Sequence, residues 1–117
     1  MPVPLYQAKA EFFRMLGHPT RIRVLELLGD GPRQVKDLLA DLGIEASNLS
    51  HQLAVLRRAG IVVSAREGST ATYALAGPDV ADLMRAARRI LTEMLAGQVE
   101  LLDTLQDAQT AAEPERL

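Results

Sequence analysis

A glycine between two short amphipathic stretches limits the possible folds of this chain more than any other feature. Residues 35–42 and 46–59 both carry apolar side chains at three- and four-residue steps, which is typical of helices with one buried face. Those side chains are Val35, Leu38, Leu39, Leu42, Leu49, Leu53 and Leu56. Gly43 follows the first stretch, where a left-handed residue is expected to end the helix. Two short helices joined by such a tight turn predict a helix-turn-helix motif.

A predicted β-hairpin comes directly after this motif. Residues 61–65 and 70–75 are β-branched or alternate in polarity, and a polar tip from Arg66 to Ser69 with a glycine lies between them. A helix is expected over residues 5–16, and a second begins at Pro19 with His18 as its cap. A long last helix, about 43 Å from Asp79 to Asp107, follows the hairpin. We therefore predict a mainly α-helical winged helix-turn-helix, with residues 1–108 as one domain and residues 109–117 as a polar, frayed tail.

The charge of the chain is unevenly distributed. The net charge of the 117 residues is -2, but residues 1–76 carry +2 and residues 77–117 carry -4, so the first two-thirds can present a positive face. The absence of cysteine excludes disulfides, thiolate metal sites and thiol redox sensing. The chain begins without the pattern of a secretory signal and has no run of 18 apolar residues. We expect a cytoplasmic protein that makes no membrane contact.

Short polar side chains gather at the start of the second helix of the motif: Ser47, Asn48, Ser50, His51 and Gln52. The leucines of this helix fix its other face to the core, so the polar side chains are expected to point largely outward. Amides can bond adenine edges, serine and histidine can bond bases or phosphates, and recognition helices read DNA from this end. An ordinary solvated face would favour Glu and Lys instead. We predict contacts with double-stranded DNA.

Basic side chains are predicted to surround this polar face. Arg57 lies near the end of the same helix, and Arg66 and Ser69 lie in the hairpin tip, where glycine lets the backbone approach a groove closely. The other candidates for a phosphate-contacting rim are Arg21, Arg23, Arg33, Lys36 and Arg58. The alternative for any one of these charges is an ordinary solvated position.

The last helix carries an apolar stripe at steps of four and three residues. Its predicted dimer contacts are Met84, Ala87, Leu91, Met94, Leu101 and Leu105, joined by Leu5 and Phe12 of the first helix. The alternative is that the stripe packs on the core of its own domain. We favour a homodimer, because exposing so much apolar surface invites aggregation. Two-fold symmetry would place two recognition helices about 34 Å apart and predicts an inverted-repeat operator.

Neither metal binding nor catalysis is predicted from the residues. The two histidines, His18 and His51, are expected to be a helix cap and a DNA contact, and the carboxylates of the last helix are expected to form a solvated acidic face. Carboxylates without histidine make poor sites for zinc, nickel or cobalt. No nucleophile pair or glycine-rich phosphate loop is visible, so we expect no cofactor and no enzyme activity.

Four segments in this order resemble the ArsR/SmtB family of winged-helix repressors: LGHPTRIRVLELL (16–28), VKDLLA (35–40), SNLSHQLAVLRRAGIV (47–62) and REGSTATYAL (66–75). The resemblance covers about residues 5–106 and is closest to cysteine-free actinobacterial members. It implies a homodimeric transcription factor that is released from its operator by an effector, which the sequence does not identify. It also implies DNA contacts at Ser47, Asn48, Ser50, His51, Gln52 and Arg66.

The chain departs from the metal sensors of that family. It has Gln34-Val35-Lys36 where arsenic, cadmium and lead sensors carry Cys-x-Cys, and its last helix lacks the histidines of zinc, cobalt and nickel sensors. Metal sensing is therefore not carried over. Two alternatives stay open: a protein-interaction module that docks a partner on the long helix, and a metal-responsive regulator with a non-standard site of carboxylates and His18.

Overall fold

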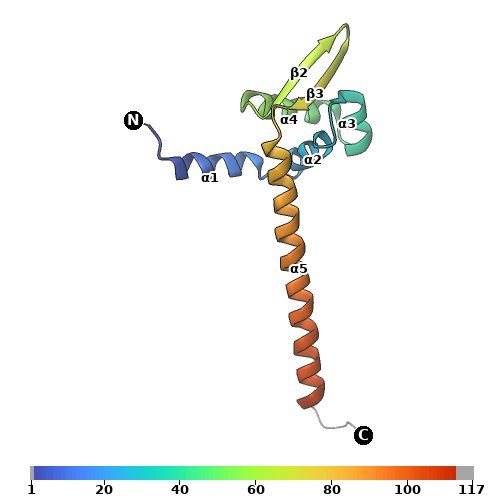
Figure 1. The fold of residues 1–117 in the computed structure, drawn as a ribbon. Helices are drawn as coiled ribbons and strands as arrows, with labels where there is room; N and C mark the ends of the chain where they lie inside the picture. The colour runs from blue at the N-terminus through green and yellow to red at the C-terminus, as the bar shows by residue number, and fades with distance from the viewer. Residues whose placement is uncertain (1, 113–117) are drawn as a thin grey trace. The chain divides into compact units, whose positions relative to one another are not determined.

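The computed structural model describes residues 2–112, and the side chains of residues 2–108. The elements, labelled in Figure 1, are α1 (Leu5–Leu16), α2 (Pro19–Leu28), β1 (Arg33–Gln34), α3 (Val35–Leu42), α4 (Ala46–Arg58), β2 (Val62–Glu67), β3 (Thr70–Leu75) and α5 (Asp79–Ala112). The predicted winged helix-turn-helix is confirmed. The chain divides into two compact units between Met84 and Arg85. None of the helices in the described residues is both long and apolar enough to cross a membrane.

The helix-turn-helix consists of α3 and α4. Gly43 has φ +63°, and its N–H donates to the carbonyl of Leu39 at 2.9 Å, which ends α3 as predicted. Leu49, Leu53 and Leu56 then fix α4 against the rest of the first unit. The core that they join comprises Leu16, Val24, Leu25, Leu27, Leu28, Leu38, Leu49, Leu53, Leu56, Ile61 and Val62.

The sheet has three antiparallel strands in the order β1-β3-β2. The hairpin pairs Val62 with Leu75 at its base and Glu67 with Thr70 at its tip, and Gly68 takes φ +60° in the two-residue turn. Strand β1, which pairs Arg33 with Tyr73, is absent from the sequence-based prediction of a two-stranded hairpin. A strand of two residues is too short to show an alternating pattern, so only the tertiary pairing reveals it.

The start of α2 has the predicted cap. His18 is extended, and its Nδ1 accepts a hydrogen bond from the backbone N–H of Thr20 at 3.2 Å. Pro19 occupies the first helical position, where its missing N–H leaves no intrahelical bond unmade.

Helix α5 continues past the predicted end at Asp107 and runs to Ala112. No glycine or proline lies between those two positions, and Pro114 is the first helix breaker in the sequence after them. Of the predicted tail, residues 109–112 belong to α5, and residues 113–117 lie outside the described residues.

Candidate nucleic-acid interface

One side of α4 carries exposed polar residues at its amino-terminal half. Ser47, Asn48, Ser50 and His51 are all exposed, while Leu49 and Leu53 between and beyond them are buried. The helical period therefore separates a core face from a polar face within a single turn. These four side chains have the exposure that the sequence predicts for them.

Gln52 does not point outward, and that part of the sequence prediction is wrong. Its side chain is only 5% exposed. The Nε of Arg21 donates to Gln52 Oε1 at 2.8 Å, and Gln52 Nε2 donates to Asn48 Oδ1 at 3.0 Å. Position 52 lies three residues after Leu49 and four before Leu56, so it belongs to the buried stripe of the helix. That spacing was the signal in the sequence, and the polar composition of the segment obscured it.

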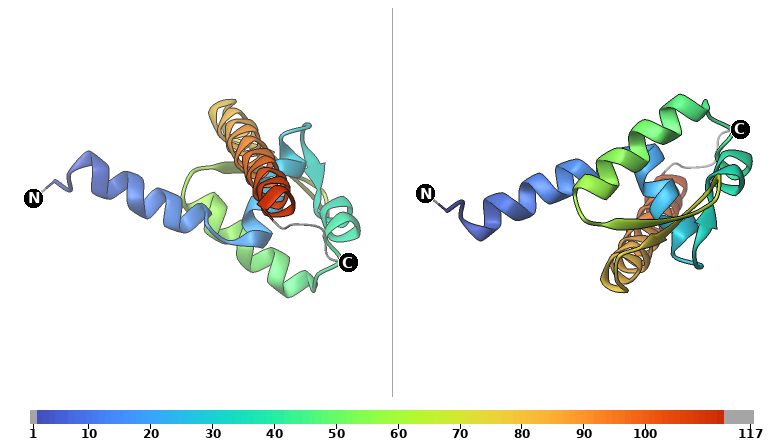
Figure 2. Two further views of the ribbon diagram at one scale, coloured as in Figure 1. Left: turned by 90° about the horizontal axis from the view of Figure 1, so that it is seen from below. Right: turned by 90° about the horizontal axis from the view of Figure 1, so that it is seen from above.

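A groove of about 760 Å³ lies between α4 and the wing. Strand β2 contacts α4, and the hairpin can be followed beside this helix in Figure 2. The groove is lined by Val35, Ser50, His51, Leu53, Ala54, Arg57, Arg58, Arg66, Ser69, Ala71 and Tyr73. It brings together five of the predicted DNA-binding residues, namely Ser50, His51, Arg57, Arg66 and Ser69.

The lining of this groove contains three arginines and no carboxylate, so it attracts anions. Arg58, which the sequence analysis placed in the phosphate-contacting rim, is one of the three. Arg57 also reaches the wing, because its Nη1 lies 3.5 Å from Ser64 Oγ of β2. The carboxyl-terminal end of α4 and the wing are thereby held together around the groove.

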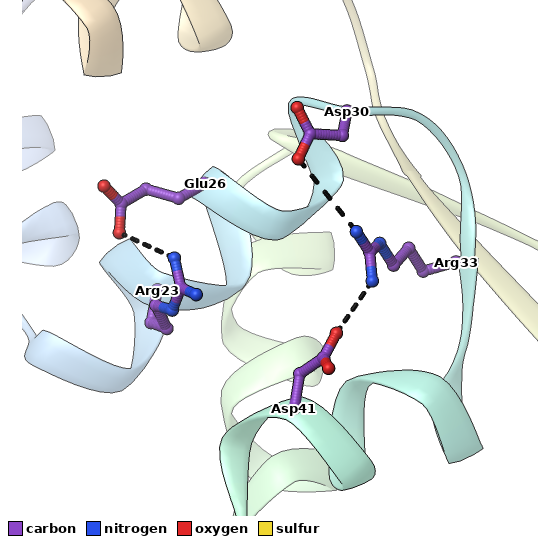
Figure 3. Close-up of polar contacts among 5 residues, drawn as sticks. All are labelled: Arg23, Glu26, Asp30, Arg33 and Asp41. Carbon is purple, nitrogen blue, oxygen red and sulfur yellow. Dashed lines mark hydrogen bonds and ion pairs between the residues drawn. The ribbon is translucent and has the colours of Figure 1, made fainter.

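Three other candidates for the rim, Arg21, Arg23 and Arg33, do not line this groove. Arg21 donates to Gln52 and, through Nη1, to the carbonyl of Met15 at 2.9 Å. Arg23 pairs with Glu26 at 3.6 Å, as Figure 3 shows.

Arg33 forms ion pairs with two carboxylates, Asp30 and Asp41. Its Nη1 lies 2.7 Å from Asp41 Oδ2, and its Nη2 lies 4.0 Å from Asp30 Oδ2 (Figure 3). Arg21, Arg23 and Arg33 thus all have partners within the fold. Lys36 remains exposed near the wing turn, where it lines a smaller hollow with Ser69 and Thr70.

Histidines and carboxylates do not cluster in the described part of the chain. No group of three or more His, Cys, Asp or Glu side chains that could hold a metal ion occurs there. His18 serves α2 as its cap, and His51 lines the groove with the arginines. Among the described side chains, His18 thus belongs to no such group with the carboxylates.

The predicted dimer residues have different environments. Leu5 is 69% exposed, whereas Phe12 and Met84 pack against the core of the first unit and Ala87 is half-buried. Along α5 beyond Met84, the large apolar side chains are between 55% and 59% exposed: Ile90, Leu91, Met94, Leu95, Val99, Leu101, Leu102 and Leu105. Four of these side chains lie outside the predicted dimer contacts: Ile90, Leu95, Val99 and Leu102.

Sequence comparison places this fold among bacterial regulators. Residues 18–64 match the family described as "Bacterial regulatory protein, arsR family". The HTH-type transcriptional regulator Rv0081 of Mycobacterium tuberculosis is 50% identical over 109 residues, which cover 92% of this chain and 96% of that relative. The crystal structure of M. tuberculosis Rv0081 superposes with a TM-score of 0.77 at 52% identity, covering 84% of this chain and 99% of that chain.

Two more distant structures share the fold. The homodimeric winged helix-turn-helix DNA-binding domain of Mb0332 from Mycobacterium bovis, a possible ArsR-family regulator, gives a TM-score of 0.69 at 31% identity over 78% of this chain and 84% of that chain. The transcriptional repressor BigR of Xylella fastidiosa gives 0.69 at 33% identity over 73% and 87%. Half-identical sequence over nearly the whole chain, joined to the same fold, shows that this chain belongs to the ArsR family of DNA-binding transcriptional regulators.

Proposed function

We propose that the protein is a homodimeric repressor that binds an inverted-repeat operator through α4 and the wing. The observation that carries this proposal is the groove between α4 and the hairpin, with Arg57, Arg58 and Arg66 in its lining beside the exposed polar face of α4. Base-reading side chains and phosphate-binding side chains are thus supplied by one continuous surface. As a member of a family of regulators, the protein is not an enzyme.

The two kinds of contact divide between the helix and the rim. Ser47, Asn48, Ser50 and His51 are exposed at the start of α4, from which recognition helices reach base edges in the major groove. Arg57, Arg66 and Ser69 line the groove and are proposed to bind the phosphate backbone, which sets the register of the protein on the duplex. Gln52 is buried, so its role is to hold a neighbouring side chain.

The exposed apolar side chains of α5 support self-association. Eight large apolar residues of this helix beyond Met84 are more than half exposed, and Leu5 of α1 is too. Monomeric proteins rarely leave so much contiguous apolar surface in water. The homodimeric state of the Mb0332 domain supports the same arrangement for this chain. A two-fold dimer predicts half-sites one helical turn apart, about 34 Å.

Repression is supported by the similarity to BigR, which is described as a transcriptional repressor. A dimer bound across a promoter prevents RNA polymerase from using it. Because DNA is the ligand, the protein would act in the bacterial cytoplasm, where the chromosome lies.

Binding to the protein's own upstream region tests the proposal. The purified full-length chain is titrated into a labelled duplex from that region and into random duplex of equal length, at several salt concentrations. A specific site is expected to bind about 10³-fold or more tightly than random duplex, and both affinities should fall as salt rises. Equal affinity for the two duplexes would contradict sequence-specific binding. Transcription from the same promoter in vitro, with and without the protein, then distinguishes repression from activation.

A further inference from the structure

Two hydrogen bonds connect the interior of the first unit to the exposed start of α4. Arg21 on α2 donates from Nε to Gln52 Oε1 at 2.8 Å, and Gln52 donates from Nε2 to Asn48 Oδ1 at 3.0 Å. Gln52 is buried, whereas Asn48 is exposed at the surface where DNA is expected. The chain of bonds therefore ends on a side chain that can reach a base.

Arg21 sets the donor-to-acceptor direction of both hydrogen bonds. A guanidinium group has donors and no acceptor, so Gln52 must turn its oxygen toward Arg21. Its NH₂ group then faces Asn48, and Asn48 must in turn present its oxygen to Gln52. The Nδ2 group of Asn48 is then the end of that amide turned away from Gln52. Chemistry, rather than packing alone, therefore fixes which end of Asn48 is available.

Arg21 is itself held firmly in place. Its Nη1 donates to the carbonyl of Met15 at 2.9 Å, in the last turn of α1, where helix carbonyls lack intrahelical partners. The guanidinium is partly buried and bonded at two of its nitrogens, to groups on two different helices. These two bonds hold the guanidinium beside Gln52 and so favour the orientation of the Gln52 amide described above.

We propose that Gln52 is a positioning residue that makes Asn48 a hydrogen-bond donor toward DNA. An unconstrained asparagine bonds adenine with its oxygen and its nitrogen together. Here the oxygen is turned toward Gln52, which places the NH₂ group on the opposite side of the amide, so Asn48 is suited to acceptors of the major groove, and guanine presents two of these side by side, N7 and O6. The inference rests on the proposed entry of the α4 face into the major groove. It assigns a base preference to Asn48 that its residue type alone does not give.

Gln52→Glu tests this proposal by reversing one bond. The introduced carboxylate accepts from Arg21 as before, but it has no donor for Asn48, which must then turn its NH₂ inward and its oxygen toward DNA. Wild type and variant, both full length, are each used to select duplexes from a randomised pool. At one position of each half-site, preference should move from guanine to a base with an exposed donor, cytosine or adenine, and the ratio of affinities should change by about fivefold or more.

The shift must depend on Asn48, so the selection is repeated with Asn48→Ala alone and with Gln52→Glu added. The shift should vanish in that background. Ala54→Glu is the matched control for added negative charge, because Ala54 is an exposed, groove-lining position of α4 that takes no part in these hydrogen bonds. It should weaken all duplexes and leave the preference at the Asn48 position unchanged. The same shift in Ala54→Glu would overturn the proposal. So would a Gln52→Glu protein that binds DNA with lower affinity but keeps the wild-type base preference.

Gln52→Met covers the case in which the buried carboxylate prevents folding, which circular dichroism would reveal. Methionine has a similar volume and removes the constraint on Asn48, so preference at that position should broaden to admit adenine. An unchanged preference would overturn the proposal. If the wild-type protein selects no sequence at all, the proposed function itself fails. That outcome differs from one in which wild type selects an operator and the Gln52 variants select the same bases, which overturns only the role of Gln52.

Discussion

Leucines of the two compact units have opposite environments. In the first unit, Leu25, Leu38 and Leu49 are fully buried among side chains of their own chain. On α5 beyond Met84, Leu91, Leu95, Leu101, Leu102 and Leu105 are all more than half exposed. The first unit thus obtains its packing from itself, while the large apolar side chains of α5 beyond Met84 are left exposed, as expected for the proposed dimer seam. The comparison predicts that leucine substitutions in the first unit lower the free energy of unfolding, whereas those on α5 weaken the dimer.

The largest effect is expected from a charge in the exposed stripe of α5. Leu101→Glu would place a carboxylate in the proposed dimer seam, and an unpaired charge in a buried interface costs about 3 to 5 kcal/mol. The dimer should dissociate about 100-fold or more readily by sedimentation equilibrium, with the circular dichroism of the first unit retained. Glu100→Gln on the same turn is the control, because that position is outside the apolar stripe. An unchanged dimer in Leu101→Glu, or a wild-type protein that is monomeric at micromolar concentration, would contradict the assignment of the α5 stripe to a dimer seam.

Truncation of a leucine in the first unit should instead lower the free energy of unfolding. Leu25 is fully buried on α2, and Leu25→Ala removes packing and leaves a cavity, at a cost of about 2 to 5 kcal/mol. Urea denaturation followed by circular dichroism measures the change. Because the proposed dimer would add stability that depends on concentration, wild type and variant are compared at equal protein concentration. A loss below 1 kcal/mol would contradict the assignment of Leu25 to the core.

Substitutions on the polar face of α4 should act mainly on DNA binding, with a smaller loss of stability at Asn48 because its oxygen accepts from the buried Gln52. Asn48→Ala removes an exposed amide, and the loss of a base contact costs about 1 to 3 kcal/mol of binding free energy with relaxed preference at one base pair. Fluorescence anisotropy on the operator and on single-base variants measures this. Lys9→Ala, at an exposed position of α1, is the control and should bind as wild type does. Equal losses on all duplexes would show that Asn48 reads no base.

Much of this site was predictable from sequence, because helical spacing and glycine positions are local signals. The spacing of Leu49, Leu53 and Leu56 located α4, and Gly43 located the turn before it. The polar character of Gln52 favours an exposed position, but its place in the leucine stripe buries it. Its partner Arg21 lies 31 residues earlier, and no local pattern predicts a hydrogen bond between residues so far apart in sequence. The pairing of Arg33 with Asp41 escaped prediction for the same reason.

The wing should contribute affinity without sequence preference. Arg66 is exposed in the hairpin and lines the groove, and Arg66→Ala removes one phosphate contact. Affinity should fall by similar factors for operator and random duplex, and the slope of log affinity against log salt should become shallower by about 0.9. Titrations at several salt concentrations measure both quantities. A loss confined to the operator would instead assign Arg66 to base reading.

The smallest effect is expected from the ion pairs at the surface of the first unit. Arg33 and Asp41 meet at 2.7 Å and join β1 to α3, but both side chains are partly exposed, so solvent screens their attraction. Asp41→Asn should therefore lower the free energy of unfolding by about 0.2 to 1 kcal/mol, less at high salt than at low salt. Glu26→Gln, which breaks the longer and more exposed pair with Arg23, should cost less still. Urea denaturation at two salt concentrations measures both variants. A loss from Asp41→Asn as large as that from Leu25→Ala would show that polar contacts, and not the buried leucines alone, make the first unit stable by itself.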